Sequence, residues 1–354
     1  ETSAQVDDFV RHHPDFFVIF GAGNSGAAPS TITTEANSKN ALTVGASELP
    51  RPAFVFGTGD AAAVAEFSSR GPAGDGRIKP ELLAPASAVI SACSSLTDSN
   101  LPGYPAYTRM QGTSMAAAIA GGNAALLREY FKKEQGLAVI SAALIKATLV
   151  NGARVLPVGP SREGFGIIDM AATIISLREN CFQLTDEWVG VAQGENLSYT
   201  YEVVDTTAPF KATLAWTDPA APYTGSTQAL VNNLDLVVRT PDGMTYYGNH
   251  FLGANSPDRA NNVEHVYLPH PVPGVYTISV QGTAVNHNTV SGSSVPLQDF
   301  ALVCGQAPVR GVVSRVAGDR VYLEQGGVLD ISGLPVVNLV DGQVVPGDEE
   351  HLFS

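Results

Sequence analysis

The sequence is poor in cysteine, in charged residues and in long apolar runs. Its three cysteines, Cys93, Cys181 and Cys304, are too few for a disulfide framework and too widely spaced for a zinc site, whose ligands come in close pairs. Charged residues make up 15% of the 354 residues, against about 25% in average proteins, whereas Gly (35) and Pro (23) are slightly frequent. This balance is typical of a loop-rich protein with β structure, and the length predicts about two domains.

Positive charge is scarce as well. Lys and Arg total 20 against 34 Asp and Glu, so the formal net charge is −14. Such a field repels phosphate backbones and anionic lipid surfaces, which excludes nucleic acid and the membrane surface from the expected partners.

Residues 110–127 are free of acidic and basic side chains but carry Gln, Thr, Ser, Asn and three glycines, so we expect a buried soluble segment there rather than a membrane span. The polar residues 1–8 do not resemble a signal peptide.

Predicted helices and strands alternate up to residue 178. We expect helices at 5–13, 113–133, 141–151 and 170–177, and buried strands at 16–20, 41–45 and 89–92. The glycine-rich loop 21–26 follows the first strand, at the carboxyl end where α/β sheets bind ligands. The fold class predicted for residues 1–178 is therefore an α/β domain built on a parallel sheet.

After Cys181 the sequence pattern changes to short runs of alternating or β-branched residues, which are separated by residues typical of turns. Strands are predicted at 197–204, 211–216, 234–239, 263–268, 274–281 and 300–303. This spacing favours an all-β jelly roll or sandwich over residues 179–304. Residues 305–354 are again strand-like and form a tail or a truncated extra domain, too short for a core of its own.

Two short segments carry candidate chemistry. Ser114 stands in the pentapeptide Gly-Thr-Ser-Met-Ala at the start of a predicted helix, where free N–H groups and the helix dipole stabilise a developing negative charge. Asn24 offers a side-chain amide in the glycine-rich loop, and such an amide can donate to the oxyanion of an acyl-transfer intermediate. Taken alone, Ser114 could equally be a helix N-cap and Asn24 a turn residue with a left-handed backbone.

Together these segments resemble the subtilisin-like serine proteases. The resemblance is carried, in the family's order, by residues 20–26 (FGAGNSG), 41–47 (ALTVGAS), 67–72 (FSSRGP), 75–81 (DGRIKPE) and 112–116 (GTSMA). It implies that Ser114 is the nucleophile, Asn24 the oxyanion-hole amide, and Gly21, Ala22 and Gly23 one wall of the primary specificity pocket. The implied substrate is a protein or peptide, and the implied location is secreted.

The β region extends this resemblance to about residue 304. Its segments 214–218, 232–236 and 258–264 are similar to the carboxyl-terminal jelly roll of one subtilase branch, related to the P-domains of proprotein convertases. Aided by the family's habit of binding calcium, we expect a calcium site at Asp235, Asp258, Asn262 and Glu264, whose oxygens suit that ion. Turn and edge polarity is the alternative. Cys181 and Cys304 bracket the region and could be bridged if its first and last strands are neighbours.

The sequence departs from the family in one respect that matters for activity. Subtilases take their base and orienting carboxylate from a His-Gly and an Asp-Ser/Thr-Gly motif that precede the oxyanion asparagine, and neither motif occurs in these 354 residues. We therefore expect the catalytic Asp and His on a missing N-terminal segment, an isolated chain that is almost inactive, and an incomplete sheet that aggregates or recruits that segment.

Two other interpretations remain open at this point. The chain could be a degenerate, non-catalytic subtilase whose β domain binds a partner or a glycan. It could also be an α/β-hydrolase esterase, but that fold needs Asp and His after the serine in a single sheet, and the all-β texture beyond Cys181 argues against it.

Overall fold

The computed structural model describes residues 2–306 except 27, 50–59, 62, 158, 223–227 and 253–254, together with five strands after residue 312. Two compact units divide the chain at residues 307–308. In the second unit β14 (Val313–Ala317), β15 (Arg320–Leu323) and β16 (Val328–Asp330) form one antiparallel sheet, and β17 (Val337–Val340) pairs with β18 (Gln343–Pro346). The first unit contains all of the candidate site residues and is described from here on.

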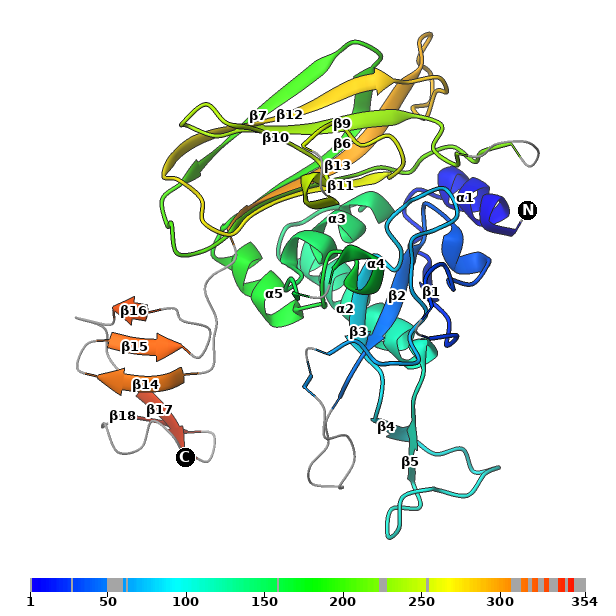
Figure 1. Cartoon of the computed structure of the whole chain (residues 1–354), viewed down its shortest axis with the longest axis vertical. Helices are drawn as coiled ribbons and strands as arrows, with labels where there is room; N and C mark the ends of the chain where they lie inside the picture. Colours follow the sequence, from blue (N-terminus) through cyan, green and yellow to red (C-terminus); the bar gives the residue numbers. More distant parts are fainter. Residues whose placement is uncertain are drawn as a thin grey trace. The chain divides into compact units, whose positions relative to one another are not determined.

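A three-stranded parallel sheet lies at the centre of the α/β part (Figure 1). Its order is β1 (Ile19–Gly21), β2 (Leu42–Ser47) and β3 (Leu82–Pro85), with Ile19 opposite Leu42 and Val44 opposite Leu82. The predicted parallel sheet is thus present, although most strands of the molecule are antiparallel.

The prediction that residues 89–92 add a strand to this sheet was wrong. Strand β4 (Val89–Ala92) pairs antiparallel with β5 (Tyr107–Met110), and neither strand is buried. The third parallel strand is instead β3, whose first three residues are buried. A run of four residues that ends in proline has no periodicity, so the sequence pattern gave no signal for it.

The predicted helices are confirmed. They are α1 (Thr2–His12), α2 (Thr113–Lys133), α3 (Ala142–Gly152) and α5 (Met170–Arg178). The structure also contains the short helix α4 (Pro160–Glu163) and 3-10 turns at Glu35–Asn37 and His250–Leu252. Helix α2 buries Ala116, Ala120, Ala124 and Leu127 along one face, as expected for a helix on a sheet. Among the helices that the structure describes, none has the length and apolar character that crossing a membrane requires.

The β part contains two four-stranded antiparallel sheets that share one apolar core. One sheet has the order β11 (Val263–Leu268), β8 (Phe210–Ala215), β13 (Leu297–Gln306) and β6 (Phe182–Ala192). The other has the order β10 (Thr245–Tyr247), β9 (Asn233–Arg239), β12 (Gly274–Ala284) and β7 (Asn196–Val203). Tyr276, Phe210 and Trp216 are fully or almost fully buried in this core. The sequence pattern missed β6 and β10.

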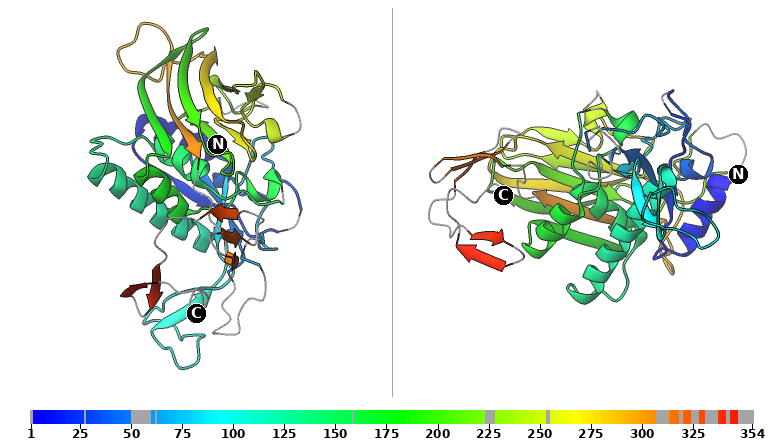
Figure 2. Two further views of the ribbon diagram at one scale, coloured as in Figure 1. Left: turned by 90° about the vertical axis from the view of Figure 1, so that its left-hand side faces the viewer. Right: turned by 90° about the horizontal axis from the view of Figure 1, so that it is seen from below.

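Helix α3 joins the two parts into one body. All eleven of its residues are buried. A single apolar cluster includes α3 residues, residues of the parallel sheet, and residues on the α3 side of the β sheet such as Ala215, Val263 and Val303. Figure 1 shows α3 between the parallel sheet and the strands of the β part, and Figure 2 gives two further views of the same elements. The predicted division at residues 178–179 falls inside this unit and stays a prediction, and the predicted tail begins close to the second unit.

Glu81 is a buried carboxylate on which three elements converge. Its Oε1 lies 2.6 Å from Lys79 Nζ and 3.4 Å from Lys146 Nζ of α3, while its Oε2 accepts a 2.7 Å hydrogen bond from the Thr43 N–H of β2. Burial by itself would raise its pKa, but the two lysines hold the pKa of Glu81 below 4.5. Lys146 also donates to the carbonyl groups of Lys39 and Ala41 at 2.9 Å.

Replacing Glu81 with Gln should destabilise the chain severely. The amide keeps the shape but leaves Lys79 and Lys146 without a counter-charge, and breaking a buried ion pair costs about 3–5 kcal/mol. Urea denaturation of the full chain measures the loss. Glu129→Gln is the matched control, because Glu129 forms an exposed pair with Lys133 on α2 and should change the unfolding midpoint little. Equal midpoints for the two variants would contradict the role given to Glu81.

Candidate active site

The loop after β1 and the start of α2 are packed against each other. A Cβ at Gly21 would lie 2.7 Å from the Thr113 carbonyl oxygen, so only glycine fits here without a shift of the backbone. The Gly23 N–H donates to Thr113 Oγ1 at 3.0 Å. These contacts join the carboxyl end of the edge strand to the positive end of a 21-residue helix.

Asn24 is held by the same helix. Its side-chain Oδ1 accepts a 2.9 Å hydrogen bond from the Thr113 N–H, and its Nδ2 has no acceptor among the described residues. The amide is therefore oriented with its two N–H donors available. Asn24 is exposed, and its backbone is not left-handed, so the interpretation as a left-handed turn residue was wrong.

Ser114 occupies the first turn of α2 and is exposed. The N-cap of α2 is Gly112, with φ at +140° and no side-chain cap, so the interpretation of Ser114 as an N-cap was wrong. A Cβ at Gly112 would lie 3.4 Å from Asn24 Nδ2, which shows how near the amide is to the helix start. The structure thus brings an exposed hydroxyl, a side-chain amide and the Ser114 N–H, which has no acceptor among the described residues, to one place.

The predicted pocket wall stays a prediction. Gly21 is half-buried, and Ala22 and Gly23 are buried. Their backbone groups are already engaged: the Ala22 N–H donates to the Val44 carbonyl at 2.9 Å, and the carbonyls of Ala22 and Gly23 accept from the N–H groups of Thr33 and Ser69. These hydrogen bonds fix the backbone of residues 22 and 23, and an extended peptide would have to use the second lone pair of each carbonyl oxygen.

No described histidine is a hydrogen-bond partner of Ser114. His12 Nδ1 bonds the Asp8 carbonyl at 2.8 Å, and His13 stacks with Phe9 at 4.5 Å between ring centroids. His250 and His265 belong to the β part. Within the described ranges, the geometry brings together a candidate nucleophile and a candidate oxyanion donor, and no histidine is hydrogen-bonded to them.

Known proteins have sequences similar to this part of the chain. Residues 1–169 match the family model described as "Peptidase_S8: Subtilase family". This part of the chain belongs to the subtilase family. The predicted resemblance to subtilases is thereby confirmed, whereas the predicted branch with a carboxyl-terminal jelly roll stays a prediction.

Curated relatives carry the name of serine proteases. The chain is 34% identical over 277 residues to "Serine protease/ABC transporter B family protein tagA" of Dictyostelium discoideum, covering 67% of this chain and 15% of that protein. It is 40% identical over 116 residues to "Serine protease AprX" of Bacillus subtilis (strain 168), covering 31% of this chain and 25% of that protein. A solved lanthipeptide protease is 17% identical with a TM-score of 0.39, covering 49% of this chain and 54% of that one. The chain spans a quarter or less of these two curated relatives.

The acidic residues predicted to bind calcium do lie near one another, but their oxygens already have partners. Asp235 pairs with Arg259 and accepts from Thr283 Oγ1 at 2.7 Å. Asp258 accepts from the N–H groups of residues 260 and 261 and from two asparagine amides, those of Asn249 and Asn261.

Asn262 and Glu264, the other two predicted calcium ligands, are also hydrogen-bonded within the protein. Asn262 points its amide at Asn40 and at the Trp216 carbonyl. Glu264 Oε2 accepts from the Leu236 N–H at 2.7 Å, and its buried Oε1 has no partner. No group of three His, Cys, Asp or Glu side chains arranged to hold a metal occurs in the described parts of the chain. This hydrogen-bonded set does not fit calcium, and calcium binding here stays a prediction.

Glu264 makes folding stability depend on pH. Burial, reinforced by Asp258 and Asp235, raises the pKa of this carboxyl well above 4.5. Between pH 4.5 and the raised pKa the folded state holds one more proton than the unfolded state, so stability falls as the pH rises through that window. Urea denaturation of Glu264→Gln at a series of pH values should show no such fall in the free energy of unfolding. The stability of the variant relative to the native chain should therefore increase toward higher pH. Parallel pH profiles for the two proteins would contradict this assignment.

The first and last strands of the β region, β6 and β13, are neighbours, as a bridge between Cys181 and Cys304 requires. Gln183 lies opposite Cys304 in this pair of strands. The two thiols are free in the structure, as is that of Cys93. Burial raises the pKa of Cys304 to about 12, so it is a thiol and not a thiolate at neutral pH. A bridge between Cys181 and Cys304 stays a prediction.

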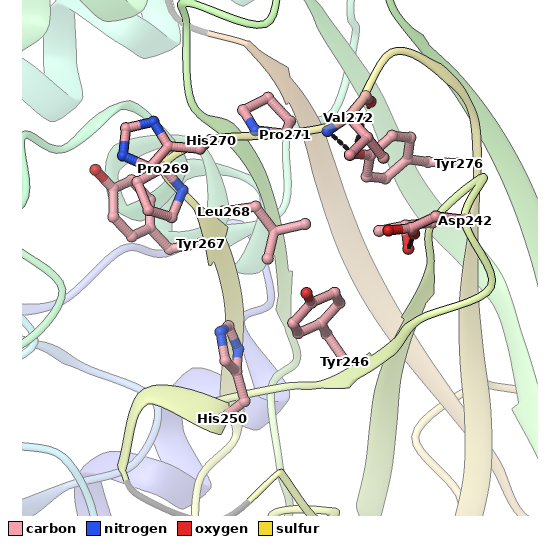
Figure 3. Close-up of a pocket in the computed structure, with 11 residues that line it drawn as sticks. Asp242, Tyr246, His250, Tyr267, Leu268, Pro269, His270, Pro271, Val272 and Tyr276 are labelled. Carbon is pink, nitrogen blue, oxygen red and sulfur yellow. Dashed lines mark hydrogen bonds between the residues drawn. The ribbon is translucent and has the colours of Figure 1, made fainter.

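A separate hollow lies on the β part (Figure 3). It has a volume of about 270 Å³, and its lining includes Tyr246, His250, His270 and Asp242. Tyr246 and His250 stand with ring centroids 5.3 Å apart, and the Tyr276 hydroxyl is bonded to the backbone of Val272. Figure 3 shows Asp242 on one side of the hollow and the two histidines on the other. Sequence reasoning assigned no residue of this hollow.

The contact between Gly21 and Thr113 can be tested with a matched pair of glycine variants. Gly21→Ala should destabilise the chain, because the new methyl group meets the Thr113 backbone. Gly121→Ala on α2 meets nothing within 4 Å and should stabilise the chain by about 0.5–1 kcal/mol through helix propensity. Thermal unfolding measures both changes, and a Gly21→Ala variant as stable as the native chain would disprove the close approach.

Proposed function

We propose that residues 1–178 are the part of a subtilisin-like serine endopeptidase domain that carries the nucleophile and the oxyanion hole. One observation carries this proposal: the Asn24 amide is fixed by the Thr113 N–H beside the exposed Ser114. The subtilase model over residues 1–169 and relatives named as serine proteases support it. The substrate class is protein or peptide, and the proposed location is secreted.

The proposed mechanism is acyl transfer. Ser114 Oγ attacks the peptide carbonyl carbon while a base takes its proton, and the carbonyl oxygen becomes an oxyanion. Asn24 Nδ2 and the Ser114 N–H donate to that oxyanion, the base returns the proton to the leaving amine, and water then hydrolyses the acyl-enzyme. The base and its carboxylate would be supplied by a segment outside the printed residues, which is then the main partner of this chain.

We infer that residues 179–304 form a jelly roll. The orders β11-β8-β13-β6 and β10-β9-β12-β7 place strands from the beginning and the end of the region side by side in each sheet, which is the pattern of two Greek keys. The shared core of the two sheets supports this assignment. A calcium ion bound to Asp235 would have to displace its ion pair with Arg259.

A non-catalytic role is the second candidate. The hollow of Figure 3, with aromatic rings, two histidines and a carboxylate, supports a β part that binds a partner or glycan. This alternative predicts that the protein has no Ser114-dependent activity in any context.

The two candidates are separated by assaying peptide hydrolysis by the 354 residues alone and by a longer polypeptide with the native upstream segment. The longer protein should be active, and Ser114→Ala should reduce its turnover by about a million-fold. Asn24→Ala should reduce turnover by about 10²–10³-fold. Asn123→Ala is the matched control, because its side chain only bonds the Ile119 carbonyl within α2.

Two results would overturn parts of the proposal. Ser114-dependent hydrolysis by the 354 residues alone would place the base within them. An inactive longer protein that is folded, or one whose activity survives Ser114→Ala, would remove the nucleophile assignment and favour the binding role.

A further inference from the structure

A second cavity lies between residues 155–165 and strand β11, on the opposite face of that strand from the sandwich core. Its volume is about 220 Å³. The walls are mainly apolar and aromatic, with Leu156 and Phe165 from one side and Phe251 and Tyr267 from the other. The cavity thus lies where the α/β part meets the β part, and it shares no lining residue with the Ser114 site.

The walls of this cavity are fixed by buried hydrogen bonds. Glu163 accepts from the Leu156 N–H at 2.7 Å and from the Gly159 N–H at 2.9 Å, which closes the loop on one side. On the other side the Asn249 Oδ1 accepts from the His265 N–H at 3.0 Å, and the Asn249 N–H donates to the His265 carbonyl at 2.8 Å. The space is therefore formed by the folded chain and needs no ligand to shape it.

His265 places an unused polar atom at this cavity. The side chain lines the cavity and is only 2% exposed. Its Nδ1 lies 2.8 Å from Thr213 Oγ1, and the Thr213 hydroxyl donates its one proton to Asn151 Oδ1 at 3.0 Å. With the Asn151 oxygen as the acceptor, the Thr213 oxygen accepts from Nδ1–H, which assigns the proton of the neutral ring to Nδ1.

Nε2 of His265 is left with a lone pair and has no hydrogen-bond partner among the described residues. Burial first, and then Lys211 and His250, hold the pKa of this ring well below 6.5, so it does not become a donor at neutral pH. A buried acceptor without a partner is costly, and a ligand that supplied a donor would remove that cost.

We propose that this cavity binds a small planar aromatic compound that carries one N–H or O–H donor, which donates to His265 Nε2. The size fits, because an apolar cavity of about 150 Å³ holds benzene and this one has room for a second fused ring. The shape fits as well: Phe165 and Phe251 meet the His265 ring edge-on, with centroids at 5.7 and 6.4 Å.

Indole and indene provide the test, because they have nearly the same shape and only indole has an N–H donor. Calorimetric titration of the full chain should show indole binding at least about tenfold more tightly than indene, as one hydrogen bond to a buried acceptor predicts. His265→Phe keeps a ring but removes the acceptor, so it should bind the two compounds equally. His287→Phe, at an exposed histidine, is the control and should keep the preference.

If a variant does not fold, the affinities of the native chain for indole and indene still test the proposal. Equal affinity of the native chain for indole and indene would overturn the assigned donor, and no binding of either would overturn the site. The proposal does not depend on the proteolytic function, since Ser114→Ala should bind indole as the native chain does. In the longer polypeptide with the native upstream segment, loss of activity in Ser114→Ala with indole binding intact separates the two proposals.

Discussion

The burial of helix α3 on every side is the constraint on which the rest of the first unit depends. A helix with no exposed residue cannot be covered by one sheet alone, so the parallel sheet, α2 and the β sandwich must all pack on it. The same helix brings Lys146 into the interior, and a buried ammonium needs a counter-charge. Glu81 supplies that charge and also binds Lys79 and the Thr43 N–H, so helix, loop and strand are held in one arrangement.

This arrangement reaches the candidate active site through the parallel sheet. Glu81 precedes β3, β3 pairs with β2, and β2 positions β1, whose last residue, Gly21, contacts Thr113 at the start of α2. Each step is a backbone contact or a buried hydrogen bond with little freedom to move. An oxyanion site needs donors fixed to a fraction of an ångström, and rigid elements provide that better than a free loop.

The sequence pattern predicted elements well where one signal decides the structure. Helix α2 has the bounds expected from its small residues, and α3 is within a residue of prediction because its apolar run is long. The pattern says that a residue is buried but not what covers it, so the junction between α3 and the β part, and the lone acceptor of His265 at that junction, could not be foreseen.

Strand β3 was missed because its pairing is decided by the Glu81 contacts on its flank. The acidic residues of the β part were correctly placed near one another, but Arg259, a neighbour of Asp258 in sequence, supplies the positive charge expected from calcium.

The oxyanion site does not depend on a histidine for its geometry. Asn24 is oriented by the Thr113 N–H, a group of the very helix that presents Ser114, and the loop that carries Asn24 is fixed by Ser69 and Val44. The proposed nucleophile and amide are thus positioned by contacts within residues 21–133, whereas the proposed base would approach the serine from another segment. In serine hydrolases the oxyanion hole and the binding groups keep part of the rate enhancement when the triad is removed, which shows that the two functions are separable. The proposed division, in which Asn24 and Ser114 lie together while no described histidine is hydrogen-bonded to the serine, is therefore physically consistent with catalytic groups contributed by different segments of one protein.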